Sequence, residues 1–220
     1  SVNTIVRRAD GSLKGYNTDA YGLTYLAERA HISFTGRKVV VFGSGGASLT
    51  AQAVAKNGGA RAVVVVSRSG EENYNNLERH ADAEVLINTT PLGMVPNTGE
   101  MPADPALFPA CKGVLDLVYN PRRTALLLRA EELGIPCADG LGMLVAQAKA
   151  AEELFFDRAI DDGENKRILR LLRESMQNIV LIGMPGSGKT TVGAALGKLT
   201  GRKVIDLDEQ IVRVAGKSIP

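Results

Sequence analysis

A glycine-rich turn between two apolar segments is the first place in this chain where residue types and spacing suit a chemical task. Residues 39–42 form a continuous apolar run, and residues 49–56 can form a helix. Between them lie Gly43, Ser44, Gly45, Gly46, Ala47 and Ser48. This is the pattern of a dinucleotide-binding turn, with Ser48 where a third glycine is usual. Such a turn brings backbone N–H groups and the positive end of a helix dipole to a pyrophosphate.

A second apolar run predicts which dinucleotide the turn would bind. Residues 61–69 read as a buried strand that ends in Ser67, Arg68 and Ser69. In such folds this position meets the adenosine ribose, where an acidic residue would accept hydrogen bonds from a 2′-hydroxyl. A guanidinium and two hydroxyls suit a 2′-phosphate instead. The sequence therefore favours NADP over NAD, against the alternative that Arg68 is a solvated residue on an ordinary turn.

A P-loop lies near the carboxyl end of the chain. Residues 183–190 satisfy its formula and follow an apolar run at 178–184 that is expected to be a buried strand. Lys189 can neutralise β and γ phosphates, and the Thr190 hydroxyl can bind magnesium. The predicted ATP site consists of Gly186, Ser187, Gly188, Lys189, Thr190 and Thr191.

The elements that would position these turns alternate as in an α/β protein with a Rossmann-like, doubly wound parallel sheet. Apolar runs at 84–89 and 113–119 predict its third and fourth strands. Two further strands are expected at 1–8 and 13–16, and helices at residues 20–31, 122–133 and 141–156. Residues 70–80 predict a short polar helix with His80 on its surface. Asn17 and Asp19 stand where a helix cap is common, so a cap is one interpretation of Asp19.

Six motifs, in their order along the chain, resemble shikimate dehydrogenase. They are residues 2–4, 15–19, the turn at 43–48, 88–94, 116–119 and 139–147. The resemblance runs from Ser1 to about Phe156, and it implies NADP-dependent reduction of 3-dehydroshikimate to shikimate. It implies Asp19 as the catalytic residue, and it adds Leu117 and Gly140 to the cofactor site. The substrate contacts that it implies are Asn3, Asp19, Tyr119 and Gln147.

The family pairs its catalytic Asp with a Lys that precedes the position of Asn3, in an N-terminal substrate domain. We expect this chain to begin too late to include that Lys. One alternative is therefore a non-catalytic NADP-binding fragment. Another is a quinate-using relative with the same fold.

The carboxyl end resembles the opening of shikimate kinase at residues 203–208 and 216–220. This resemblance implies Asp206 near the magnesium and Asp208 as an acceptor from shikimate hydroxyls, with ATP and Mg as cofactors. The predicted domains are an NADP-binding domain at 1–160, in which 1–19 end the substrate domain, a helical linker at 161–177 and a truncated, incomplete P-loop kinase βαβ segment at 178–220. The parent would be a bifunctional enzyme of chorismate and aromatic amino acid biosynthesis.

Composition sets limits on partners. Lys and Arg number 26 against 24 Asp and Glu, so the formal net charge is only +2 and predicts neither a nucleic-acid nor a membrane partner. Cys111 and Cys137 lack metal-ligand spacing and read as reduced thiols of a cytoplasmic protein. We expect small-molecule substrates, leave the oligomeric state open, and expect residues 178–220 to be poorly ordered or to self-associate.

Overall fold

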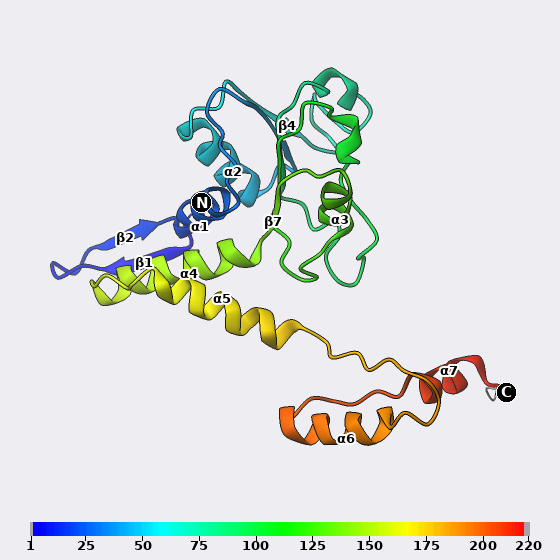
Figure 1. Cartoon of the computed structure of the whole chain (residues 1–220). Helices are drawn as coiled ribbons and strands as arrows, with labels where there is room; N and C mark the ends of the chain where they lie inside the picture. Colours follow the sequence, from blue (N-terminus) through cyan, green and yellow to red (C-terminus); the bar gives the residue numbers. More distant parts are fainter. Residues whose placement is uncertain (1, 218–220) are drawn as a thin grey trace. The chain divides into compact units, whose positions relative to one another are not determined.

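The computed structural model describes residues 2–217, so the last three residues of the motif at 216–220 lie outside it. The chain divides into two compact units, Ser1–Arg173 and Glu174–Pro220. Each unit is described by itself (Figure 1).

A parallel sheet of five strands forms the centre of the first unit. Its order is β4-β3-β5-β6-β7, from strands β3(Lys38–Phe42), β4(Ala62–Val66), β5(Val85–Asn88), β6(Gly113–Asp116) and β7(Cys137–Asp139). Phe42 is in register with Val66 on one side and with Asn88 on the other. The strand order therefore changes direction at β3, and in such sheets the crevice beyond the carboxyl ends at this point binds ligands.

Helices cover both faces of the sheet, as the doubly wound prediction requires. Val39 and Val41 point to a core shared with α1(Thr18–Arg29) and α2(Gly46–Asn57), whereas Val40 and Phe42 point to a core shared with α3(Ala125–Glu132). The alternate side chains of β3 are thus buried on opposite faces, which explains its unbroken apolar run. Figure 1 shows α1 and α4(Leu141–Phe156) beside each other, and α5(Gly163–Met176) adds Leu169 to a small apolar cluster with Leu141 and Val145 of α4.

An antiparallel hairpin precedes α1. It consists of β1(Thr4–Arg7) and β2(Leu13–Tyr16), in the regions where strands are predicted. Ile5 and Leu13 are exposed on it. The hairpin delivers the chain directly into α1, so the residues on either side of it are held at the start of that helix.

Two predicted helices of the first unit are shorter in the structure than expected. The helix predicted at 122–133 begins only at Ala125, because the Thr124 side chain caps it by accepting a hydrogen bond from Leu127 N at 3.3 Å. The polar helix predicted at 70–80 is only a 3-10 turn, η1(Leu77–His80). Asparagine side chains bind the loop backbone there instead, as when Asn73 Oδ1 accepts from Asn75 N at 2.9 Å.

The prediction that His80 lies on the surface is wrong. Its side chain is buried, and its Nε2 lies 2.9 Å from Oε2 of Glu72. This contact joins residues 72 and 80 of the segment between β4 and β5. His80 therefore has a packing role that the polar character of its neighbours concealed.

The second unit contains α6(Lys189–Thr200) and α7(Leu207–Ala215). The buried strands expected at 178–184 and 204–207 do not form in the described part of this unit, where Val180 and Ile182 are 72% and 90% exposed and Leu207 begins α7. Two short strands alone are marginal in water, because they need a larger sheet to cover them. Among residues 2–217, no helix has the length and apolar character to cross a membrane.

Candidate functional site

The glycine-rich turn leaves β3 at the point where the strand order changes. Gly43 has φ 105°, a backbone conformation that favours glycine, and its N–H donates to Val66 O at 2.8 Å. A side chain there would also collide, because a Cβ on Gly43 would lie 2.7 Å from Thr89 Oγ1. The turn is therefore fixed between the ends of β4 and β5.

The amino end of α2 is open. Its cap residue is Gly45, which makes no side-chain cap hydrogen bond, and a Cβ on Gly45 or Gly46 would meet no atom within 4 Å. Ser44 and Ala47 are exposed beside them, whereas Ser48 is fully buried. The glycines thus leave room for a ligand at the positive end of the helix, which fits a dinucleotide pyrophosphate.

The end of β4 presents the residues predicted to select the dinucleotide. Ser67 is buried and its N–H donates to Glu72 O at 3.2 Å, whereas Arg68 and Ser69 are exposed. Burial raises the pKa of Tyr74, and the nearby charge of Arg68 opposes that rise. The Tyr74 ring is stacked on Phe42, with 6.4 Å between the ring centroids. The exposed guanidinium of Arg68 therefore lies near the Tyr74 ring, which packs on Phe42.

A second group of side chains joins three segments that are distant in sequence. Asn3 Nδ2 donates to Thr18 Oγ1 at 3.1 Å, and the Thr18 hydroxyl is 3.3 Å from its acceptor Gln147 Oε1. The Gln147 amide nitrogen donates to Leu144 O at 3.1 Å. The structure thus brings together the predicted substrate residues Asn3 and Gln147, and it adds Thr18, which the sequence analysis did not select. We call these three residues the amide cluster.

Asn17 connects this cluster to the glycine-rich turn. Its Oδ1 accepts from Ala20 N at 3.3 Å, so Asn17 and not Asp19 caps α1, and its Nδ2 is 3.4 Å from Thr50 Oγ1 on α2. Asp19 lies in the first turn of α1, next to Thr18, and is partly exposed. Its carboxylate does not cap α1, since Asn17 serves as the cap.

The remaining predicted residues of this unit lie on the loop after β6 and at the start of α4. Gly140 is buried against this loop, and a Cβ there would lie only 2.1 Å from Leu117 O. Leu117 is partly buried, whereas Tyr119 is 43% exposed. The described contacts do not join Tyr119 to the amide cluster.

A buried carboxylate that the sequence analysis left without a role organises this loop. Asp116, at the end of β6, accepts from Asn88 Nδ2 at 2.9 Å, Val118 N at 3.1 Å and Thr124 Oγ1 at 2.6 Å. Its burial raises the pKa of Asp116 to about 6, although these hydrogen bonds act in the opposite direction. A polar residue within each of two otherwise apolar runs, Asn88 in 84–89 and Asp116 in 113–119, was the signal that could have revealed the pair.

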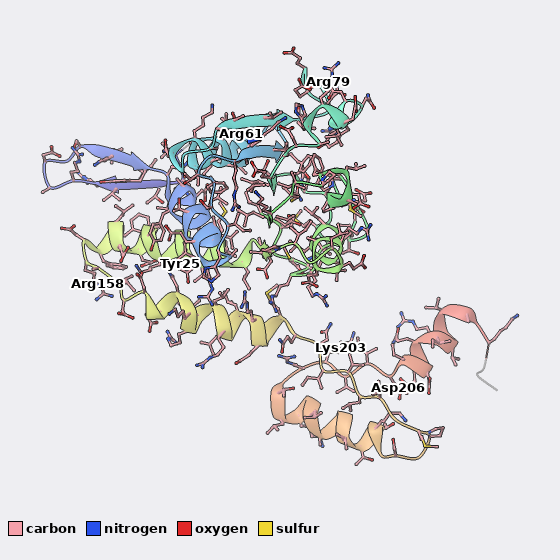
Figure 2. The ribbon with its side chains drawn as sticks, turned by 45° about the horizontal axis from the view of Figure 1, so that its top comes forward. Tyr25, Arg61, Arg79, Arg158, Lys203 and Asp206 are labelled. Carbon is pink, nitrogen blue, oxygen red and sulfur yellow. The ribbon has the colours of Figure 1, made fainter. Side chains whose placement is uncertain are left out.

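An open concavity of about 550 Å³ adjoins the amide cluster. Asn17, Thr18 and Tyr21 line it from the start of α1, opposite the end of α4 and the turn that carries Arg158, which Figure 2 labels. Lys149 forms ion pairs with another residue of α4 and with the segment that follows this helix. Its ammonium lies 2.9 Å from both Glu153 Oε1 and Asp162 Oδ1; burial alone would lower the pKa of Lys149, but these two partners raise it.

The P-loop in the second unit adopts a compact turn. Gly186 and Gly188 have φ 77° and 82°, and Lys189 Nζ donates to Gly183 O and Met184 O, both at 2.8 Å. Thr190 and Thr191 stand in the first turn of α6, and Ser187 lies within the turn. Asp206 caps α7 by accepting from Asp208 N at 3.0 Å (Figure 2). The predicted ATP residues are therefore contiguous around one helix end.

Comparisons with known proteins place the first unit among shikimate dehydrogenases. The shikimate dehydrogenase (NADP(+)) of Clostridium perfringens (strain SM101 / Type A) is 36% identical in an alignment of 186 residues that covers 79% of this chain and 68% of that protein. The protein of that name from Sphingopyxis alaskensis is 38% identical over 190 residues, covering 78% and 66%. A shikimate kinase family model matches residues 185–220.

Solved structures give the same result. A chorismate mutase/shikimate 5-dehydrogenase fusion protein from Clostridium acetobutylicum has a TM-score of 0.76 at 33% identity, covering 81% of this chain and 69% of its own. Shikimate 5-dehydrogenase from Thermus thermophilus in complex with NADP(H) and shikimate has a TM-score of 0.67 at 28% identity, with coverage of 78% and 68%. Quinate dehydrogenase from Corynebacterium glutamicum in complex with NAD has a TM-score of 0.70 at 26% identity, with coverage of 79% and 68%.

Proposed function

The chain belongs to the shikimate dehydrogenase family of oxidoreductases, and we propose that its first unit holds NADP and part of the site that reduces 3-dehydroshikimate to shikimate. The observation that carries the proposal is the link through Asn17. This residue starts α1 beside the amide cluster and reaches Thr50 on α2, the helix that begins at the glycine-rich turn. A substrate at the amide cluster and a dinucleotide at the turn would therefore bind to adjoining helix ends.

Each group of residues has a distinct task in this proposal. The N–H groups at the start of α2 bind the pyrophosphate, and Arg68 with Ser67 and Ser69 binds the 2′-phosphate. Gly140 lets the Leu117 backbone pack against the start of α4, and Leu117 would lie beside the nicotinamide end of the cofactor. Bound NADPH supplies the hydride for the substrate carbonyl.

The amide cluster and Asp19 would act on the substrate. Asn3 and Gln147 can each donate to one oxygen and accept from another, which suits a ring with several hydroxyls. Because both amides already bond within the cluster, substrate hydroxyls would replace the contacts to Thr18 and Leu144. Asp19 would hold the proton that moves to or from the reacting oxygen, and Tyr119 would contact the substrate from the loop after β6.

Arg68 provides the test of the cofactor. A fluorescence titration with NADPH and NADH should give saturable binding that favours NADPH. In Arg68→Ala the affinity for NADPH should fall about 10- to 100-fold, the value of a charge-assisted contact to phosphate, while NADH binding stays unchanged.

The matched control is Arg79→Ala, an exposed arginine on η1 that Figure 2 labels away from the turn. It should leave both titrations unchanged. Equal loss of NADH and NADPH binding in Arg68→Ala would show that Arg68 supports the fold and not the 2′-phosphate.

Quinate is a second candidate substrate, because a quinate dehydrogenase is among the structural neighbours. Saturation-transfer NMR with shikimate and quinate, each in the presence of NADP, separates the two. Binding of shikimate alone would support the first assignment, and preferential binding of quinate would replace it.

We also propose that the second unit is the beginning of a shikimate kinase, fused to the dehydrogenase. The family match at 185–220 and the compact P-loop support this. Lys189 would bind ATP phosphates, Thr190 and Asp206 would hold Mg²⁺, and Asp208 would accept from shikimate hydroxyls. Calorimetric titration with Mg-ADP tests it: binding that Lys189→Ala abolishes supports the proposal, and binding that this change leaves intact contradicts it.

A further inference from the structure

A groove of about 270 Å³ runs beside β7, the strand at the edge of the sheet. It is bounded by α1, by α3 and the segment before it, and by α5, and all of its lining residues belong to the first unit. None of them belongs to the glycine-rich turn or to the amide cluster. Its charged lining residues are Arg29, Arg122, Arg123, Arg173, Glu131 and Asp139.

The positive charges of this groove exceed its negative charges. Arg123 pairs with Glu131, and Arg122 Nε lies 3.5 Å from Asp139 Oδ2. Arg29 and Arg173 make no ion pair with any described residue. The groove therefore holds two guanidinium groups whose charge is not balanced by any carboxylate among residues 2–217.

Two buried donors point to a missing acceptor. The Nε atoms of Arg122 and Arg173 are inaccessible to solvent, and neither has a hydrogen-bond partner among the described residues. Buried N–H groups almost always have partners. Arg122 Nε has only its 3.5 Å ion-pair contact with Asp139, and Arg173 Nε has no partner among the described residues, so the Arg173 donor above all requires an explanation. The two donors come from different elements, the segment before α3 and helix α5, and both line the same space.

We propose that this groove binds the phosphate group of a small phosphate monoester. Guanidinium groups from separate elements suit a tetrahedral anion with several acceptor oxygens, whereas one guanidinium alone can hold a planar carboxylate in a fork. The groove volume of about 270 Å³ has room for a phosphate with a few attached carbons.

Ligand binding in this groove would change the position of the loop after β6. Arg122 lies three residues beyond Tyr119, and Asp139 immediately precedes Gly140, which packs against Leu117. A bound phosphate that drew Arg122 away from Asp139 would shift both ends of this loop. The ligand would therefore shift Leu117, which is proposed to lie beside the nicotinamide, although the ligand itself binds outside the cofactor site.

The test is an NMR titration of the arginine Nε–H signals of the full chain at constant ionic strength. The probes are inorganic phosphate and glycerol 3-phosphate, with sodium succinate as the carboxylate comparison. We expect saturable shifts of the Arg122 and Arg173 signals with both phosphates, unchanged by saturating NADPH, and none with succinate. Tighter binding of glycerol 3-phosphate would identify the monoester as the ligand class, and equal or weaker binding would overturn that assignment.

Arg29→Gln provides the variant, because this exposed side chain pairs with no carboxylate in the described part of the chain and the change should leave the fold intact. It should weaken phosphate binding about 10-fold. Arg7→Gln, on the exposed hairpin strand β1, is the matched control and should change nothing. Equal binding of succinate, displacement by NADPH, or undiminished binding in Arg29→Gln would overturn the proposal.

Discussion

At the carboxyl end of β6, the single buried carboxylate of Asp116 holds together the loops after two neighbouring strands. It accepts from Asn88 at the end of β5 and from Thr124, whose oxygen also caps α3. The arrangement satisfies every donor that surrounds it, but it places a charge where no solvent reaches. Such a group favours its protonated form, which is why burial raises the pKa of Asp116 to about 6.

Asp116 gives a prediction about stability and pH. Its pKa is higher in the folded state than its ordinary value of 3.8, so the folded protein binds the proton more tightly. Stability should therefore fall by roughly 3 kcal/mol as the pH rises from about 4 to 6. Asp116→Asn removes the titration and should flatten this part of the profile, as measured by urea unfolding between pH 4 and 7.

Asp116→Ala is the companion variant. It leaves Asn88 Nδ2, Val118 N and the Thr124 hydroxyl without their acceptor, so it should lower the unfolding free energy by on the order of 3 kcal/mol at pH 4. The difference from the wild type should shrink as the pH rises to 6, because only the wild type loses stability through titration of Asp116. A wild-type slope that persists in Asp116→Asn would show that another group titrates in this range.

At the scale of elements, charged side chains tie together the starts of the strands, at the sheet edge opposite the proposed cofactor site. Lys112 lies 2.8 Å from Glu84, Arg61 lies 3.1 Å from Glu84, and Lys38 lies 2.5 Å from Asp82. Figure 2 labels Arg61 just before β4. The hydrogen bond from Lys112 lowers the pKa of Glu84, and that from Lys38 lowers the pKa of Asp82.

The pH dependence that this network gives to stability is opposite in sign to that of Asp116. Because the folded-state pKa values are lowered, its contribution is present above the ordinary carboxyl pKa and is lost as the pH falls through the folded values. Glu84→Gln should lower the Tm by about 1–3 °C in low salt and by less in high salt, since the pairs are screened. Glu78→Gln, at an exposed residue of η1, should leave the Tm unchanged; an equal effect of both changes would contradict the network.

Local sequence patterns anticipated the elements with continuous or periodic apolar residues. The bounds of α4 agree with the prediction at both ends, β5 lies within its apolar run, and β3 begins one residue before its run. Prediction failed where side chains compete with backbone hydrogen bonds, as Asn73 does in the loop after β4. Most of the site could be located from its motifs, but the contacts of Thr18 with Gln147 and of Asp116 with Asn88 depend on segments that only folding brings together.

At the scale of the whole molecule, the two units differ in how they bury apolar side chains. The first unit has continuous cores on both faces of its sheet. In the second unit, Val180, Ile182, Leu199 and Val214 are between 72% and 90% exposed. Exposed apolar side chains next to backbone that lacks strand partners favour association between chains.

A chain that ends at Met176, the last residue of α5, tests whether the units are independent. It retains every residue of the first unit, so its Tm and its affinity for NADPH should equal those of the 220-residue chain. Light scattering should show concentration-dependent association of the 220-residue chain that the shortened chain has lost. Weaker NADPH binding by the shortened chain would mean that the second unit supports the cofactor site. A monomeric 220-residue chain whose amides at 178–184 resist hydrogen exchange would mean that the second unit covers its apolar residues by itself.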